Sequence, residues 1–294
     1  MKNILSRIIS CVSGIESGNA GVLSWSLAGE TLTVSGTGAM PDFKSKNSPW
    51  GSFRDRITSV VIGDGVTSVG NRAFYKCERL ASATIPNSVV SIGISAFSGC
   101  IALEAVTIPD SVKTIGFGAF YDCRSLVSID IPDSVTVVED GAFGICTALT
   151  SVTLPNSVAV IGNRLFAGCR SLISVKMPVA TTVIRSNAFS GCRNLPSITI
   201  PEPVTIIGSS AFANCEDLIS ISIPSLVEII RFYAFAGCRS LTEISNYAVV
   251  PQEIDPNVFT EIDFSTCILR VPEDSVEAYQ NTDVWKNFKF IFTV

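Results

Sequence analysis

The feature that most constrains this chain is a 23-residue period that runs through most of its 294 residues. Eight of its ten cysteines keep this step, at Cys77, Cys100, Cys123, Cys146, Cys169, Cys192, Cys215 and Cys238. A phenylalanine precedes each of them by three residues, and a leucine follows each by three. A fixed period of about 20–50 residues is typical of a solenoid, in which each repeat buries its apolar face against its neighbours. The period therefore overrides any interpretation of the chain as an ordinary globular domain.

One unit, residues 111–132, indicates what each repeat folds into. Its second half reads LVSIDI, and this alternation of apolar and polar residues predicts a strand with one buried face. Pro132 follows the strand, and because proline has no N–H it suits the point where the chain leaves the ladder. The glycine-rich centre, residues 116–123, predicts a tight turn or a single helical turn. Stacked at about 4.8 Å per rung, nine such strands beginning at residues 57–62 form one parallel sheet roughly 40 Å long.

Segments outside the period predict covers for the two open ends of the stack. Residues 23–27 and 32–34 alternate on either side of a turn, which predicts a β-hairpin. This hairpin and Trp50 are expected to cover the first rung, because a bare end would expose core and strand edge. At the other end, Ser275 is the expected N-cap of a short helix, and Trp285 is expected to cover the last rung.

The repeat resembles a known family. The elements Ile-Pro-x-Ser-Val, Ile-Gly-x-x-Ala-Phe-x-x-Cys and x-x-Leu are similar to those of BspA-like (Treponema-type) leucine-rich-repeat proteins, over residues 57–244. The segments LSWSLAGETLTVSGTGAMPDF and VPEDSVEAYQNTDVWKNFKFI resemble the terminal caps of bacterial members. Three units depart from the pattern, because the glycine four residues before the phenylalanine is replaced by Glu139, Arg185 and Arg231.

The resemblance implies a leucine-rich-repeat solenoid, β-rich although of the α/β type, that forms an arc with one parallel β-sheet. The expected zones are an N-terminal leader and hairpin cap at residues 1–56, the repeats at 57–246, and an irregular last repeat with a C-terminal cap at 247–294. The family also implies a non-catalytic, adhesin-like binding protein, secreted or exposed at a bacterial surface.

Composition narrows the possible chemistry further. The chain has no histidine, which removes Ser-His-Asp and Cys-His catalysis and histidine-ligated zinc. A net charge of −5 without a basic run argues against a nucleic-acid partner, whose phosphates require clustered Lys and Arg. Every apolar run is well short of the ~18 residues that a membrane span needs. We therefore expect no enzyme activity, no cofactor, no metal, no nucleic-acid partner and no transmembrane segment.

The cysteines leave three interpretations: metal ligands, disulfides between rungs, or small apolar residues stacked in the core. No Cys-x-x-Cys occurs, and the regular spacing favours stacked, free, buried thiols. Cys11 and Cys267 lie off the period and are better candidates for modification or pairing. Cys11 follows a short basic and apolar segment that weakly resembles a lipoprotein signal. Lipidation there is one alternative, and the others are a leader that is truncated, absent or supplied by another secretion route.

Recognition is expected on outward strand positions and on loops. The outward strand positions are mostly serine and threonine, which offer little for tight binding. A richer column follows the cysteines, at Arg124, Arg170, Arg193 and Arg239. These guanidiniums could engage carboxylates or phosphates of a partner, or they could form a solvated charged rim.

Exposed aromatic residues give a second candidate surface, since variable turn positions hold Phe117, Phe232 and Tyr233. These rings are either contact points for a partner or packing along the ridge of the solenoid. The partner is expected to be a protein or a glycan on a host or cell surface. The alternative function is a structural assembly or spacer protein of a virion or cell envelope.

Overall fold

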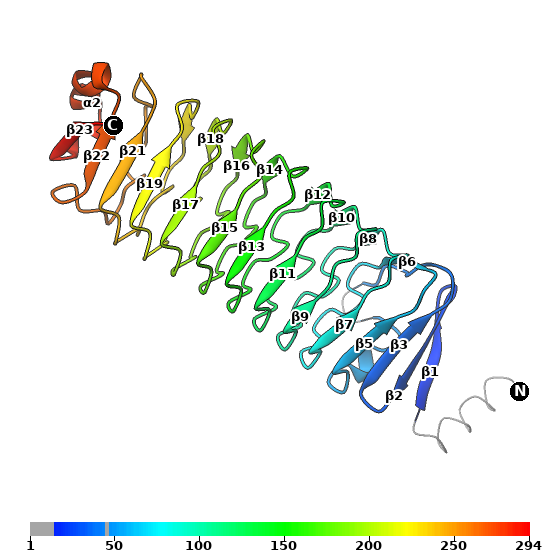
Figure 1. Ribbon diagram of the computed structural model, residues 1–294. Helices are drawn as coiled ribbons and strands as arrows, with labels where there is room; N and C mark the ends of the chain where they lie inside the picture. Colours follow the sequence, from blue (N-terminus) through cyan, green and yellow to red (C-terminus); the bar gives the residue numbers. More distant parts are fainter. Residues whose placement is uncertain (1–14, 45–46) are drawn as a thin grey trace, which may run out of the picture.

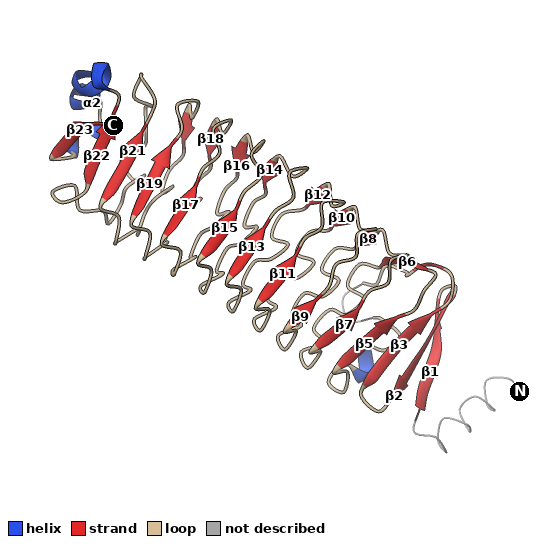
Figure 2. Cartoon of the chain, viewed as in Figure 1, coloured by secondary structure: helices blue, strands red, loops and turns tan. Residues whose placement is uncertain are grey.

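The computed structural model describes residues 15–44 and 47–294, which form an elongated β-solenoid (Figure 1). Each 23-residue unit makes one turn of the solenoid, and successive turns stack with their strands parallel (Figure 2). The expected leader and Cys11, with the lipidation hypothesis, lie outside the described residues. Within the described ranges, no helix has the length and apolar content that a membrane crossing requires.

The predicted first sheet is present as a column of nine parallel strands in three consecutive hydrogen-bonded groups. Equivalent residues 23 positions apart pair in register, as Ser128 does with Ser151 and Ser151 with Ser174. The strands are β5 (Ser59–Ile62), β7 (Ser82–Thr84), β9 (Ala105–Val106), β11 (Ser128–Asp130), β13 (Ser151–Thr153), β15 (Ser174–Lys176), β17 (Ser197–Thr199), β19 (Ser220–Ile223) and β21 (Glu243–Asn246). The prediction of a parallel leucine-rich-repeat sheet is confirmed.

A second column of short parallel strands lies on another side of each turn, and the sequence pattern did not reveal it. A strand of only two residues is too short for its sequence to show an alternation of apolar and polar side chains. The strands are β4 (Gly38–Ala39), β6 (Val66–Val69), β8 (Ser91–Ile92), β10 (Thr114–Ile115), β12 (Val137–Val138), β14 (Val160–Ile161), β16 (Val183–Ile184), β18 (Ile206–Ile207) and β20 (Ile229–Ile230). A serine in the preceding turn helps to join the rungs, since Ser134 Oγ donates to the Val112 carbonyl at 2.8 Å.

The third side of each turn is the predicted tight turn, and it adds another hydrogen-bonded connection between rungs. The amide of Phe120 donates to the carbonyl of Ala142 in the next rung at 2.8 Å, and equivalent bonds recur along the stack. Two residues in each of these turns have a left-handed backbone, such as Gly118 at φ 56° and Asp122 at φ 63°. Glycine adopts this conformation without steric cost, which explains its frequency in the centre of the repeat.

The core contains a continuous column of aromatic rings. The centroids of successive rings lie 5.1–5.8 Å apart, and the planes of most pairs are nearly parallel. The column runs through Trp50, Phe74, Phe97, Phe120, Phe143, Phe166, Phe189, Phe212, Phe235 and Phe259. Stacked aromatic pairs contribute about 0.5–1.5 kcal/mol each beyond the area that they bury.

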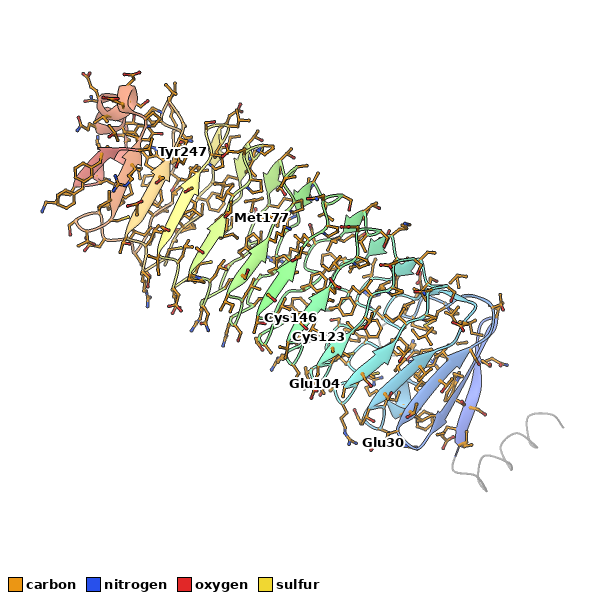
Figure 3. The ribbon with its side chains drawn as sticks, in the orientation of Figure 1. Glu30, Glu104, Cys123, Cys146, Met177 and Tyr247 are labelled. Carbon is orange, nitrogen blue, oxygen red and sulfur yellow. The ribbon has the colours of Figure 1, made fainter. Side chains whose placement is uncertain are left out.

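The periodic cysteines lie beside this column, free and buried. Seven of them donate an S–H hydrogen bond to the phenylalanine carbonyl of the preceding rung, with sulfur–oxygen distances of 3.1–3.3 Å. Figure 3 shows Cys123 and Cys146 in two consecutive turns. Burial raises the pKa of Cys169 to about 12, which keeps the thiol neutral. Cys267 is equally buried and free, so the structure does not support its assignment as a site of modification or pairing.

The N-terminal end is covered as expected, with one additional strand. The predicted hairpin consists of β2 (Leu23–Ala28) and β3 (Thr31–Ser35), and β1 (Ile15–Ala20) extends it as a third antiparallel strand. β3 also pairs in parallel with β5, so the hairpin continues the first sheet. The 3-10 turn η1 (Gly51–Phe53) follows Trp50, whose indole stacks on Phe74 and donates to the Ala73 carbonyl at 2.8 Å.

The C-terminal end is closed by two strands and three short helical segments. β22 (Ile268–Val271) and β23 (Phe290–Thr293) extend the first sheet beyond β21. Between them lie η2 (Glu273–Ser275), α2 (Val276–Asn281) and η3 (Trp285–Asn287). Trp285 contacts Phe259 edge-on at 5.3 Å and so terminates the aromatic column.

Ser275 lies at the predicted N-cap position, but its side chain does not make the hydrogen bond of a cap. Ser275 precedes α2, but its Oγ is buried without a hydrogen-bond partner. Its backbone, at φ −109° and ψ −8°, is near the helical region, because η2 has already turned the chain there. A capping serine has an extended backbone that directs its hydroxyl at the amides of the first turn.

The aromatic column predicts a large effect for a central ring. Phe143→Ala should lower the free energy of unfolding by about 3–5 kcal/mol, because it leaves a cavity between two stacked rings. Denaturant unfolding followed by far-UV circular dichroism measures this loss. Phe117→Ala is the matched control, since Phe117 is 54% exposed, and it should cost less than about 1 kcal/mol. A loss below about 0.5 kcal/mol for Phe143→Ala would place that ring outside the core.

The buried thiols predict a loss of stability at alkaline pH. Burial raises the pKa of Cys77, Cys169 and Cys238 to about 12, whereas thiols of an unfolded chain ionise near about 8.5. Because the folded pKa is the higher one, the stability is fully present below about pH 8.5 and is lost as the pH rises toward 12. Between these two pH values, the free energy of unfolding should fall by about 1.4 kcal/mol per pH unit for each buried thiol, because the thiol ionises only in the unfolded chain.

Urea midpoints measured between about pH 7 and pH 10 test this expectation. Alkylation of the native protein followed by mass spectrometry gives an independent check, since buried neutral thiols should react only after unfolding. A midpoint that does not change over that pH range, or rapid labelling of several periodic cysteines, would contradict it.

Candidate functional site

The outward face of the first sheet carries mostly small hydroxyl side chains, as expected from the sequence. Ser82 Oγ donates to Ser59 Oγ at 3.3 Å, so this pair of side chains is hydrogen-bonded between two rungs. Two aromatic side chains lie on this face at the C-terminal end, where Phe290 and Phe292 stack on each other at 6.2 Å and remain 38% and 48% exposed. Most of this face offers no concave or aromatic feature for a ligand.

The arginine column lies on an exposed edge, but three of its four guanidiniums already have carboxylate partners. Arg124 Nε lies 2.7 Å from Asp122 Oδ1, and Arg193 Nε lies 3.4 Å from Glu216 Oε1. Arg239 pairs with Glu261 at 3.0 Å. Arg170 has no ion pair within the described chain. The charge of this edge is therefore largely compensated. Exposed ion pairs of this kind contribute only about 0–1 kcal/mol to stability, so a carboxylate of a binding partner can compete for the arginines.

The three candidate aromatic residues are exposed, and they lie at two separate places. Phe117 is 54% exposed, and Phe232 and Tyr233 are 51% and 42% exposed. Phe232 and Tyr233 contact each other edge-on at 6.0 Å. Phe117 and Phe232 occupy the same position of the repeat but lie 115 residues, or five periods, apart.

Between these two places the second column of strands carries an apolar stripe that the sequence analysis missed. The stripe consists of the outward residues of five consecutive strands, Val137, Val160, Val183, Ile206 and Ile229. The equivalent residues of the three preceding rungs are Ser68, Ser91 and Thr114. Hydroxyl side chains therefore suit this position, so strand geometry alone does not require the change to valine and isoleucine. Five rungs at about 4.8 Å spacing make the stripe about 19 Å long.

The stripe has a charged margin. Glu139, Arg185 and Arg231 follow its residues by two positions and are exposed. These three residues replace the glycine that most repeats have four positions before the phenylalanine, so the departures from the repeat pattern lie along the border of the stripe. At one end, Val137 and Val160 line a hollow of about 330 Å³ together with Phe117. At the other end, Ile229 lies in the same turn as Phe232.

The second column of strands is interrupted between β12 and β14. In six rungs, the residue after the short strand donates a backbone hydrogen bond to the rung before it, as Gly116 N does to the Ile92 carbonyl. The equivalent bond from Gly162 to Val138 is lacking among the described residues. Asp140 bridges the two rungs instead. Its carboxylate accepts from Asn163 N at 2.8 Å and from Asn163 Nδ2 at 2.7 Å.

The described residues contain no cluster of three or more His, Cys, Asp or Glu side chains with the geometry to hold a metal ion. The carboxylates of the irregular last repeat are engaged locally: Asp263 accepts hydrogen bonds from Ser265 and Thr266, which lower its pKa. The surface features that remain are therefore the stripe with its aromatic ends, the interruption beside Asp140, and the arginine edge.

Comparison with known proteins identifies the family. The BspA type leucine rich repeat region, in six copies, matches residues 52–172 and 160–279. This match covers most of the chain, which therefore belongs to the BspA-type leucine-rich-repeat family, as the repeat motif predicted.

Solved structures agree with this assignment. A leucine-rich repeat protein from Bacteroides ovatus is 25% identical with a TM-score of 0.64, over 95% of this chain and 77% of that one. The leucine-rich repeat protein of T. pallidum is 30% identical with a TM-score of 0.52, over 69% of this chain and 91% of that one. A search of curated proteins finds no match.

The interruption predicts a structural role for Asp140. Asp140→Ala should lower the free energy of unfolding by about 1–3 kcal/mol, because it leaves the half-buried Asn163 amide without its acceptor. The matched control is Asp130→Ala on the exposed face of β11, which should change stability by less than about 0.5 kcal/mol. Denaturant unfolding compares the two. Equal effects would show that Asp140 does not hold the rungs together.

Proposed function

We propose that this chain is a non-catalytic, adhesin-like binding protein that acts outside the cell or at its surface. Membership of the BspA-type leucine-rich-repeat family supports a protein-binding role. The absence of histidine from the sequence supports the further proposal that the chain has no enzymatic activity. The proposed partner is a protein of a host or of another cell surface.

The observation that carries the proposal is the apolar stripe with its aromatic ends. Apolar residues scattered singly over a surface are ordinary, but a contiguous apolar patch with a polar margin is typical of a protein-binding site. Phe117 at one end, and Phe232 with Tyr233 at the other, supply the large rings that often dominate binding energy. Glu139, Arg185 and Arg231 supply charges along the margin that can select a complementary partner.

The arginine edge is the second proposed contact surface. Arg170 has no carboxylate partner among the described residues, whereas a partner must displace an internal ion pair to engage Arg124, Arg193 or Arg239. Displacing an exposed pair costs little, so this edge can add affinity and salt dependence. We rank it below the stripe because its net charge is largely compensated.

A structural assembly or spacer function is the alternative proposal. The uninterrupted column of rings from Trp50 to Trp285 supports it, because such a core resists bending between rungs. A fixed number of copies in a purified particle or envelope fraction would favour this alternative.

The binding proposal predicts that partner capture depends on the stripe. The immobilised chain is used to capture partners from a host-surface extract, and the affinity of an identified partner is then measured for variants. Val160→Thr combined with Val183→Thr should weaken binding about tenfold, which corresponds to about 1.4 kcal/mol, and leave the strands intact because threonine is also β-branched. The matched control is Val127→Thr with Ile173→Thr, at exposed positions away from the stripe, and it should bind normally.

Charge reversal at Arg170 and Arg193 to glutamate tests the second surface in the same assay. If the edge contributes, this variant should bind more weakly and with a flatter salt dependence. A variant at the stripe that binds like the wild type, together with a loss at the arginines, would move the contact to the edge. Wild-type binding by both variants would refute both surfaces.

A further inference from the structure

A hollow of about 640 Å³ lies over the turns beside the interruption between β12 and β14. It shares Phe117 and Asp140 with the smaller hollow at the end of the stripe. Volumes of about 300–1,000 Å³ are typical of small-molecule sites, whereas a flat solenoid surface offers none. The protein-binding proposal does not require this hollow, so its role is a separate question.

The hollow exists because two consecutive rungs lack a side chain at the same left-handed position of the turn. That position holds Gly118 and Gly141, whereas the rungs on either side have Ser95 and Arg164 there. A Cβ at Gly141 would meet no atom within 4 Å, so the space above it is open. The lost backbone bond between Val138 and Gly162 separates the rung of Gly141 from the rung of Arg164, so it lies next to this opening.

Two aromatic side chains line the hollow, Phe117 and Tyr121. The ring of Tyr121 lies against Gly144 of the next rung, where a Cβ would be 2.9 Å and 3.0 Å from two ring carbons. A larger residue than glycine would therefore displace the ring. Both rings keep substantial exposure, 54% for Phe117 and 38% for Tyr121, so they offer apolar area to a ligand.

Polar groups without protein partners share the hollow with these rings. Ser98 is 7% exposed, and its hydroxyl makes no hydrogen bond with a described residue and keeps contact with solvent. The side-chain amide of Asn187 and the guanidinium of Arg164 also lack partners in the described chain. These side chains therefore offer solvent-facing donors and acceptors with which a ligand can pair.

We propose that this hollow binds a carbohydrate, one or two sugar rings in length. A pyranose ring has an apolar face of C–H groups, which suits the rings of Phe117 and Tyr121, and a rim of hydroxyls that both donate and accept. The hydroxyl, amide and guanidinium groups are of the types that pair with such a rim. A phosphate ligand would require several cations or a nest of amides, and Arg164 is the one lining cation.

The test uses three disaccharides with different sugars: lactose, cellobiose and N,N′-diacetylchitobiose. Binding to the full chain is measured by saturation-transfer-difference NMR and calorimetry up to roughly 20 mM, which detects millimolar Kd values. At least one disaccharide should bind. Tyr121→Ala should weaken binding about tenfold or more, and Tyr121→Phe should retain most of it.

Gly141→Tyr is the second variant, because it fills the hollow directly. Tyr233 occupies the equivalent left-handed position at φ 60°, so a tyrosine is compatible with the fold there. Ser210→Tyr is the matched control, at the same position of a rung outside the hollow. Gly141→Tyr should abolish binding, and Ser210→Tyr should leave it within about twofold of the wild type.

Two results would overturn the proposal. One is the failure of all three disaccharides to bind at the highest concentration, and the other is binding that survives both Tyr121→Ala and Gly141→Tyr. Neither result affects the stripe, which is tested with a protein partner and with different variants. The two proposals can therefore fail independently.

Discussion

The structure depends on the hydrogen-bonded register between residues 23 positions apart. Backbone bonds on all three sides of the turn hold this register. It places each phenylalanine ring on the aromatic ring of the previous rung, and it places seven of the eight periodic cysteine sulfurs against the phenylalanine carbonyl of the previous rung. A shift of one residue would turn the strand side chains over and expose the ring column. The register is therefore both the source of the core and the reason that its residues repeat so strictly.

The surfaces proposed for binding arise where individual rungs use the same register differently. Where the second column changes from Ser91 and Thr114 to Val137, the strands keep their parallel register and only the outward chemistry differs. Where one backbone bond is lost between Val138 and Gly162, the rungs are instead joined through the carboxylate of Asp140. A repeat scaffold tolerates such local changes because each rung contacts only its neighbours.

The two proposed sites share Phe117, and they differ in what they can bind. The stripe is long, shallow and apolar, so it suits an extended protein surface. The larger hollow is compact and mixes rings with unpaired polar groups, so it suits a small polar ligand. Phe117 lines both the hollow at the end of the stripe and the larger hollow. Tyr121 and Gly141, which line only the larger one, are therefore the residues that separate the two activities.

The sequence by itself determined the period, the first sheet, the buried cysteines and phenylalanines, and the aromatic cover at both ends, because each follows from residue type repeated at a fixed step. It also identified Phe117, Phe232 and the arginines as exposed positions. Only the tertiary structure decided that three arginines are already paired, since their carboxylates come from Asp122, Glu216 and Glu261 at no regular spacing. The second column of strands and the stripe also required the structure, because two-residue strands have no periodicity of their own. The larger hollow depends on two glycines of consecutive rungs, Gly118 and Gly141, which become adjacent only when the rungs are stacked.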